Sequence, residues 1–395
     1  MSYSVVLVNS WRVVNAKGGT EKVFCELANA LNKRGFRVTM LFCDPNQGEP
    51  GFVVDDEVRI LNVGMGREGW ASKVVSKIRA FSFDSETRKK KRSWLKIEKL
   101  SGCLKKAKKL LEESDVVLSF QPETTFILKK RLLIKTPMIS MFHHNPSKYF
   151  SDPLFNPFFW EALSECEILQ VLRPEFIKEL VDVGLEKAVC IPNSCAILKQ
   201  QRNLSARKIV YTGRVNLKQK RVDLLIKSFA LLKDDFPDWC VEVWGELNLN
   251  SHDTKYVRAL IERLGLGGRI FLKGATNDVE SVLLSSSIFA FPSAYEGFGL
   301  SLIEAMMVGL PCVGCVDCPA VNTLIRNECN GILVEPNPKS FAKGLSILME
   351  NEACRNLYGG EARRTAMFYE PETVWNSWEL LLKNIVSKSE IEKIK

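Results

Sequence analysis

Two carboxylates eight residues apart follow a buried apolar strand pattern in the second half of the chain. Glu296 directly precedes Gly297, Phe298 and Gly299, and Glu304 lies eight residues after it. Glycines here let main-chain N–H groups approach a ligand, and the N-terminus of the helix that follows attracts phosphate through its unpaired amides. Carboxylates accept hydrogen bonds from sugar hydroxyls. The segment predicts a site for a hydroxyl-rich ligand that carries phosphate; alternatively, the glycines permit a tight turn and Glu296 caps the helix.

The chain that must position these residues alternates short apolar runs with helical patterns. Runs of strand length cover residues 4–8, 36–42, 115–120, 138–142, 209–212, 240–244, 270–272, 288–291 and 311–316. They are apolar on both faces, which is typical of parallel strands covered by helices on each side. After the first run, residues 23–31 have helical spacing, with Thr20 as the expected cap and Gly35 as the expected left-handed stop. The pattern predicts an α/β fold.

Length and local composition predict two domains. At about 100 to 200 residues per domain, a chain of 395 residues favours two. Residues 199–208 are polar and separate two strand–helix series, as an interdomain linker does. We therefore predict an N-terminal domain over residues 1–202, a second domain over residues 203–372, and a helix over residues 373–395 that packs back on the first domain.

The overall composition excludes several classes of protein. Hydrophobic residues make up 46% and charged residues 26% of the chain, which argues against collagen, coiled coil and disorder. No uncharged apolar stretch approaches the about 18 to 20 residues of a membrane helix, and MSYSVVLVNS lacks the features of a signal peptide, so we expect a cytoplasmic protein. The twelve cysteines lie mostly in apolar patterns, so we expect buried thiols.

A strongly basic segment lies between residues 73 and 109. It holds fourteen Lys and Arg against three acidic residues, a net charge of +11, whereas the whole chain carries +9. Few aromatic residues interleave with the charges, and no nucleic-acid-binding module is present, so we predict that this segment binds an anionic membrane surface and not nucleic acid. The alternative is a solvated loop and helix face.

Several motifs in a fixed order resemble the GT-B fold retaining glycosyltransferases of family 4. The segment from Glu296 to Glu304 resembles the family's E-x7-E signature, which continues at Ala305, Met306, Gly309 and Pro311. The family's opening glycine loop and first helix resemble NAKGGTEKVFCELANALNKRG, and the strand that leaves its first domain resembles IPNS. The start of its donor domain resembles YTGRVNLKQKRVDLLIKSF, and its penultimate strand resembles NGILVEP. The resemblance covers nearly the whole chain and implies two doubly wound Rossmann-like domains that face a cleft.

The resemblance also implies roles for single residues. The catalytic set would be His143, Arg214, Lys220 and Glu296, and the donor-binding set Gly18, Gly19, Gly213, Gly297, Phe298, Gly299, Leu300 and Glu304. Arg214 and Lys220 would neutralise a diphosphate, on which negative charge grows as its bond to the sugar breaks. Five residues separate this pair where the family more often has four, so Lys218 is the alternative to Lys220. Lys218 and Arg221 are otherwise expected to be solvated.

The remaining implied roles belong to the first domain. His143 would touch the transferred sugar, and His144, which also follows the strand over residues 138–142, is the alternative. Gly18 and Gly19 would close over the phosphate.

The implied activity is the transfer of a sugar from a nucleoside diphosphate sugar, with a UDP-sugar favoured, to a hydroxyl of a glycan or lipid-diphosphate-linked saccharide. The anomeric configuration would be retained, and no cofactor or metal is expected, in keeping with the lack of a D-x-D triplet. The expected process is polysaccharide, lipopolysaccharide or glycoconjugate synthesis by a cytoplasmic enzyme on the inner face of the membrane. CPAVNTLI, after Asp317, departs from the family's usual Gly-Pro and Glu. The alternatives are a catalytically silent GT-B scaffold that binds glycan and a nucleotide-sugar epimerase.

We assign no ligand to two other motifs. Gly64, Gly66 and Gly69 form G-x-G-x-x-G with Asp84 twenty residues after the first glycine, but the intervening segment is basic and no strand places Asp84 at a ribose. The C-x-x-C-x-x-C of Cys312, Cys315 and Cys318 has a spacing found in metal sites. Strand alternation would turn its first two side chains to opposite faces, and no fourth ligand is near.

Overall fold

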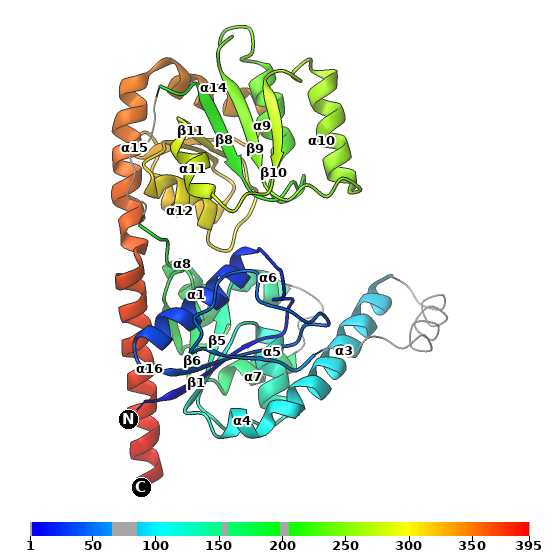
Figure 1. The fold of residues 1–395 in the computed structure, drawn as a ribbon, viewed down its shortest axis with the longest axis vertical. Coiled ribbons are helices and arrows are strands. Elements are labelled where there is room, and N and C mark those ends of the chain that lie inside the picture. The colour runs from blue at the N-terminus through cyan, green and yellow to red at the C-terminus, as the bar shows by residue number, and fades with distance from the viewer. Residues whose placement is uncertain (1, 65–84, 152–156, 198–204, 395) are drawn as a thin grey trace. The chain divides into compact units, whose positions relative to one another are not determined.

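The computed structural model describes residues 2–64, 85–151, 157–197 and 205–394 (Figure 1). These residues form two compact units, each built on its own sheet. The N-terminal unit comprises residues 1–193 and 374–395, and the C-terminal unit comprises residues 194–373. Every strand pair in both sheets is parallel, so the predicted fold of two Rossmann-like α/β domains is confirmed.

The N-terminal unit has a seven-stranded sheet in the order β3-β2-β1-β4-β5-β6-β7. Its strands are β1 Ser4–Asn9, β2 Arg37–Phe42, β3 Arg59–Asn62, β4 Val116–Ser119, β5 Met138–Phe142, β6 Ile168–Val171 and β7 Ala188–Cys190. Its helices are α1 Gly19–Lys33, α3 Ser85–Leu104, α4 Lys108–Glu112, α5 Pro122–Phe126, α6 Pro146–Ser151, α7 Pro157–Ser164 and α8 Pro174–Val181. The order reverses at β1 and β4, the arrangement at which such sheets bind ligands.

The C-terminal unit has a six-stranded sheet in the order β10-β9-β8-β11-β12-β13, which reverses at β8 and β11. Its strands are β8 Lys208–Thr212, β9 Cys240–Trp244, β10 Ile270–Gly274, β11 Ile288–Phe291, β12 Cys312–Cys315 and β13 Gly331–Val334. Its helices are α9 Val222–Ala230, α10 His252–Arg263, α11 Val279–Leu284, α12 Leu300–Met307, α13 Pro319–Leu324, α14 Pro338–Glu350 and α15 Glu352–Ala366.

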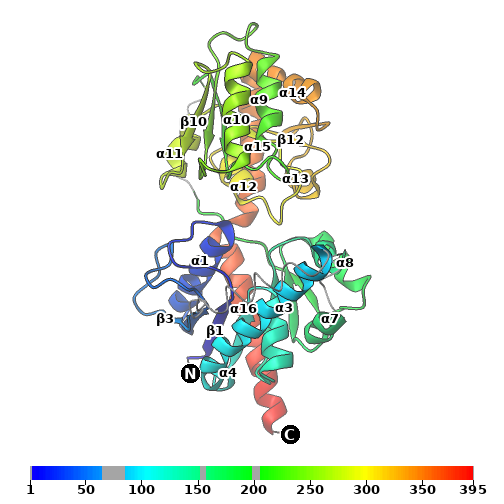
Figure 2. The ribbon, with the colours of Figure 1, turned by 90° about the vertical axis from the view of Figure 1, so that its right-hand side faces the viewer.

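Apolar layers on the sheets explain why the strands read as continuous hydrophobic runs. In the C-terminal unit α9, α10 and α14 pack on one face, where their apolar residues form one cluster with alternate residues of the strands (Figure 2). In the N-terminal unit one face packs against α3, α4, α5, α7 and α8. On the other face the Phe24 ring of α1 packs edge to face on Phe42 and Phe120.

The first helix begins differently from the prediction. It starts at Gly19 with Gly18 as its N-cap and no side-chain cap, so Thr20 is not the cap. Gly35, at φ 85°, adopts the left-handed conformation that was predicted for the stop. A glycine cap leaves the first amides of α1 without a capping side chain, which is the arrangement that suits an anionic ligand.

The last helix, α16 (Pro371–Ile394), runs from the end of the C-terminal unit into the N-terminal unit. Within the latter, Arg34, directly after α1, pairs with Glu379 at 3.4 Å, and Trp378 and Leu382 are buried. The boundary between the units falls after Asn193, nine residues before the predicted one, because the Cys195 N–H donates to the Tyr369 carbonyl of the C-terminal unit at 2.7 Å. No helix among the described residues has the length and hydrophobicity to span a bilayer.

Candidate functional site

The turn between β11 and α12 carries the two predicted carboxylates. Gly299, at φ 88°, is the N-cap of α12, and no side chain caps this helix, so Glu296 is not its cap. Glu304 lies in the second turn of α12 and is partly exposed. The Phe298 ring is only 5% exposed and packs edge to face on Tyr369, with ring centroids 5.4 Å apart. Phe298 therefore offers a ligand its main chain and not its ring.

Lys220 and Glu296 form a largely buried ion pair in the C-terminal unit. Lys220 Nζ lies 2.6 Å from Glu296 Oε1, and the two side chains are 12% and 9% exposed. Lys220 Nζ also lies over the Phe291 ring, 5.6 Å from its centroid. The two residues follow β8 and β11, the neighbouring strands at which the strand order reverses. A cation, a carboxylate and an uncapped helix N-terminus thus occur together at this edge of the sheet.

The turn of residues 216–221 directs Lys220 toward the β11–α12 turn. The carbonyl oxygen of Asn216 accepts hydrogen bonds from the main-chain N–H groups of Lys220 and Arg221, both at 3.0 Å. Lys218, the alternative that the spacing left open, is exposed. The geometry therefore favours Lys220 over Lys218 as the buried cation.

Gln219 joins this turn to the neighbouring loop. Its carbonyl oxygen accepts from the Ala294 N–H at 2.8 Å, and its side-chain amide donates to the Tyr295 carbonyl at 3.3 Å. Its own N–H donates to the Asn216 side chain at 2.6 Å. Because these contacts flank the ion pair, they fix the main chains that carry both of its members.

Arg214 follows β8, and its side chain is exposed. The Tyr211 hydroxyl donates a hydrogen bond to the Arg214 carbonyl at 2.9 Å. Burial, with a smaller contribution from the Glu296 charge, raises the pKa of Tyr211 well above its usual value. The phenol therefore remains a hydrogen-bond donor at neutral pH and holds the main chain of Arg214 in place.

Three glycines let the loops after β8, β9 and β10 lie against one another. Gly213, Gly245 and Gly274 have φ values of 153°, 150° and 83°. The Gly245 N–H donates to the Gly274 carbonyl at 2.8 Å, and a Cβ on Gly245 would lie only 2.0 Å from the Gly213 carbonyl oxygen. Gly213 was predicted to belong to the donor-binding set; the structure also requires glycine at position 245.

His143 lies at the carboxyl end of β5 in the N-terminal unit and is buried. Its ring stacks on Phe120 with centroids 5.0 Å apart. Burial, helped by neighbouring His144, lowers the pKa of His143 to about 3, so the imidazole is neutral at physiological pH. Its Nε2 atom makes no hydrogen bond within the described residues. His144, by contrast, is exposed, and its ring lies 6.1 Å from that of Trp11.

Gly18 and Gly19 form the start of α1, and both are exposed. The structure thus places the predicted residues in two groups. Gly18, Gly19 and His143 lie at the carboxyl ends of strands in the N-terminal unit. In the C-terminal unit, Gly213, Arg214 and Lys220 lie on the loop after β8, the residues from Glu296 to Gly299 lie on the loop after β11, and Leu300 and Glu304 lie in α12.

The sequence did not reveal the roles of Arg221, Asp317 and Gln219. Arg221 is not a solvated neighbour of Lys220, because its guanidinium makes two hydrogen bonds to Asp317, at 2.9 and 2.6 Å. Two features of the sequence pointed to these loops: the extra residue between Arg214 and Lys220, and the departure from the family pattern after Asp317. Neither feature shows that Arg221 pairs with Asp317.

The cysteine motif is packed in the core, as predicted. Cys312 and Cys315 lie on β12, and Cys318 follows it; all three are buried. Burial raises the pKa of the Cys315 thiol to about 12 and that of the Cys318 thiol to about 11. No cluster of three or more metal-ligating side chains occurs in the described ranges. Of the G-x-G-x-x-G motif, Gly64 follows β3, while Gly66, Gly69 and Asp84 lie outside the described residues.

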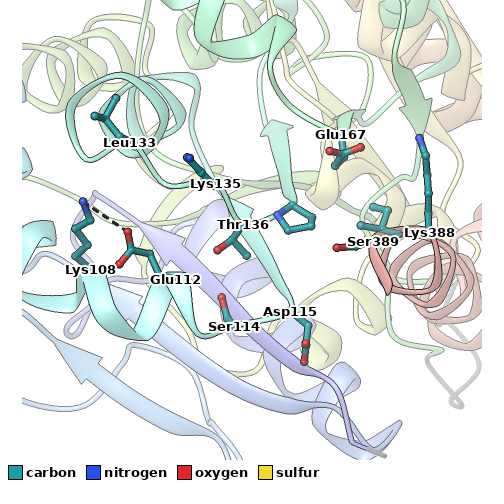
Figure 3. Close-up of a pocket in the computed structure, with 12 residues that line it drawn as sticks. Lys108, Glu112, Ser114, Asp115, Leu133, Lys135, Thr136, Glu167, Lys388 and Ser389 are labelled. Atoms are coloured by element: carbon teal, nitrogen blue, oxygen red, sulfur yellow. Dashed lines mark ion pairs between the residues drawn. The ribbon is translucent and has the colours of Figure 1, made fainter. Parts of the chain in front are cut away.

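A pocket of about 640 Å³ lies at the amino-terminal ends of strands in the N-terminal sheet (Figure 3). Asp115, Pro137 and Glu167 in its lining precede β4, β5 and β6, and side chains of α4 and α16 complete it. None of the predicted site residues lines this pocket. The predicted chemistry lies at the other ends of the strands.

Comparisons with known proteins point to one family and one fold. Residues 197–365 match the family described as Glycosyl transferases group 1. A Haemophilus influenzae protein described as an uncharacterized glycosyltransferase is 23% identical over 93% of this chain and 97% of its own length. A Campylobacter jejuni N-acetylgalactosamine-N,N'-diacetylbacillosaminyl-diphospho-undecaprenol 4-alpha-N-acetylgalactosaminyltransferase is 30% identical over 42% of this chain and 44% of its own length. The structure of Anabaena HepE in complex with UDP and glucose is similar with a TM-score of 0.75 at 14% identity, covering 97% of this chain and 100% of that one.

Proposed function

Residues 197–365 belong to the glycosyl transferases group 1 family, and from this premise we propose that the protein is a retaining glycosyltransferase. It takes a sugar from a nucleoside diphosphate sugar, with a UDP-sugar favoured, and transfers it to a hydroxyl of a glycan or lipid-linked saccharide. The UDP and glucose named for the Anabaena HepE complex support the choice of donor.

The observation that carries the proposal is the largely buried pair of Lys220 and Glu296 beside the uncapped N-terminus of α12. When the bond between the anomeric carbon and the phosphate oxygen breaks, negative charge grows on the departing diphosphate. Lys220, Arg214 and the amides of residues 297–300 stabilise that charge where it develops. Glu296 holds sugar hydroxyls, and Glu304 holds those of the ribose.

The proposed reaction is a front-face substitution. The acceptor oxygen forms its bond to the anomeric carbon on the face from which the diphosphate leaves, so the configuration is retained. The acceptor proton passes to an oxygen of the departing phosphate. The proposal needs no metal, because Lys220 and Arg214 supply the positive charge. In the N-terminal unit, neutral His143 exchanges a hydrogen bond with a hydroxyl of the transferred sugar, and the amides of Gly18 and Gly19 bind phosphate.

We also propose a lipid-linked acceptor and a peripheral position on the inner face of the membrane, in polysaccharide or lipopolysaccharide synthesis. The diphospho-undecaprenol substrate in the name of the Campylobacter relative supports the acceptor. The basic segment supports the position, although Lys108 pairs with Glu112 on the same helix and Lys109 pairs with Glu113 directly after it. Its part over residues 73–84 lies outside the described residues. The proposal predicts flotation with anionic vesicles that weakens at high salt; flotation independent of lipid charge and salt would refute it.

A screen of thermal shifts against UDP-, GDP- and ADP-sugars, followed by assay of nucleoside diphosphate release, tests the enzymatic function. We expect one donor to stabilise the protein, an acceptor to increase release, and Glu304→Ala to abolish it. Binding without release by the wild-type protein would instead identify a silent scaffold. Conversion of the donor without an acceptor would identify an epimerase. NMR of the product distinguishes retention from inversion.

A further inference from the structure

The residue directly after Lys220 has an unusual backbone conformation. Arg221 lies at φ 49° and ψ 42°, in the left-handed region, and is the N-cap of α9. For a residue other than glycine this conformation costs about 1–2 kcal/mol. Such strain persists only where the surroundings enforce it, and it is often found at functional sites. The Arg221 side chain shows what enforces it here.

The Arg221 guanidinium binds the Asp317 carboxylate through both of its terminal nitrogens. Nη1 donates to Oδ1 at 2.9 Å and Nη2 to Oδ2 at 2.6 Å, and the two side chains are 25% and 35% exposed. A bidentate pair of this kind fixes direction as well as distance. Asp317 follows β12, whereas Arg221 follows β8, and β11 lies between these strands in the sheet. The pair therefore spans three adjacent loops.

Lys220 and Arg221 are consecutive and hold different loops. Lys220 pairs with Glu296 after β11, and Arg221 pairs with Asp317 after β12. The carbonyl of Asn216 binds the main-chain N–H of both residues. A change at Arg221 to an ordinary helical conformation would rotate the main chain where it leaves Lys220. The conformation of Arg221 is thus coupled to the position of the Lys220 ammonium group.

We propose that Arg221 and Asp317 are positioning residues that hold Lys220 against the diphosphate of the sugar donor. This inference rests on the proposed function, because it takes the diphosphate as the ligand of Lys220. Neither Arg221 nor Asp317 needs to touch the donor. Their part is to keep one ammonium group in place, so their loss should affect recognition of the diphosphate and not that of the nucleoside.

The test compares affinities for UDP, GDP and ADP with those for uridine, guanosine and adenosine, measured by calorimetry or competition. The variants are Asp317→Asn, which keeps the size of the side chain, and Arg221→Ala, which removes the guanidinium but keeps the backbone strain. We expect each to weaken binding of the preferred nucleoside diphosphate about 10-fold, which corresponds to about 1.4 kcal/mol, and to change binding of its nucleoside less than 2-fold. Arg221→Lys, which cannot form the bidentate contact, should behave in the same way.

Asp238→Asn is the matched control, because Asp238 pairs with Arg207 in the same unit but just before β9 and β8, at the opposite edge of the sheet. It should leave both affinities unchanged. Equal weakening of nucleoside and diphosphate binding, with a lower melting temperature, would show a merely structural role and overturn the inference. Unchanged diphosphate binding in the variants would overturn it while leaving the proposed function intact. Failure of the wild-type protein to bind any of the three diphosphates would overturn both.

Discussion

Replacing Glu296 by glutamine tests the ion pair at the centre of the candidate site. The amide keeps the size of the side chain and an oxygen that can accept from Lys220, but it removes the negative charge. With 2.6 Å between Nζ and Oε1, the Coulomb energy at an effective dielectric constant of about 20 is about 6 kcal/mol. Desolvation of both groups offsets much of this energy, and the remaining charge is left unpaired when one partner is lost. We expect the free energy of unfolding to fall by about 2–3 kcal/mol.

In a unit of about 180 residues, a loss of this size lowers the melting temperature by about 4–12 °C, which scanning calorimetry can resolve. Glu242→Gln is a suitable control. Glu242 is also largely buried and pairs with Lys208 and Lys273, at 3.4 and 3.7 Å, but it lies within β9. Both variants should lose stability. Only the Glu296 variant should change the response to a nucleoside diphosphate.

The decisive measurement is the stabilisation by UDP. Once Glu296 no longer neutralises Lys220, the diphosphate is its natural counterion, and UDP lacks the sugar that Glu296 is proposed to hold. Saturating UDP should therefore raise the melting temperature of Glu296→Gln by more than that of the wild-type protein, because ligand that binds only the folded state adds stability in proportion to the logarithm of its affinity. Turnover should nevertheless fall about 100-fold or more. An equal or smaller UDP shift in the variant would refute a contact between Lys220 and the diphosphate.

Three further outcomes can be checked independently. Gly245→Ala should abolish nucleotide binding or folding, because its Cβ would lie 2.0 Å from the Gly213 carbonyl oxygen. The Cβ of Gly274→Ala has open space around it, so this variant should lose only about 1–2 kcal/mol of stability through backbone strain. Calorimetry distinguishes the two losses of stability. Tyr211→Phe leaves a carbonyl without its donor and should lower stability by about 1–3 kcal/mol and weaken UDP binding. Burial holds the pKa of His143 at about 3, below the about 6.5 of an exposed histidine. Its contribution to stability is therefore complete above about pH 6.5 and is lost toward pH 3, by up to about 1.4 kcal/mol per pH unit, and denaturant unfolding of His143→Asn should lack that slope.

The architecture was predictable from the sequence because both sheets are parallel and buried. Their strands read as uninterrupted apolar runs, such as β4 and β11, and turns at glycines such as Gly299 mark where helices begin. The ends of elements were harder to predict. Threonine is one of the residues that commonly cap helices, so Thr20 was the predicted cap, yet the N-cap of α1 is Gly18 and the helix starts two residues earlier than predicted. The amino-acid types alone cannot show that Gly18 and not Thr20 is the N-cap, because glycine and threonine are both acceptable caps.

Contacts between loops were not predictable for a different reason. Arg221 and Asp317 are 96 positions apart in the sequence, and neither lies on a periodic pattern. Their meeting depends on the order of β8, β11 and β12 in the sheet, which brings the two loops to the same edge. The type of a residue gives its chemistry, but only topology gives its partner. Arg221 was therefore interpreted as solvated, although an arginine is well suited to such a bidentate contact.

The five residues between Arg214 and Lys220 show how one extra residue can be absorbed without displacing a buried cation. Lys218 follows Arg214 after three intervening residues, one fewer than the commoner spacing, and it lies on the exposed part of the turn. The Asn216 carbonyl accepts hydrogen bonds from the N–H groups of Lys220 and Arg221 and so closes the turn. The left-handed conformation of Arg221 then leads the chain into α9. Because that conformation is strained, a contact outside the turn has to maintain it, and Asp317 supplies one. The extra residue after β8 is thus accompanied by an ion pair to the loop after β12. The spacing between Arg214 and Lys220 and the unusual sequence after Asp317 therefore have to be interpreted together.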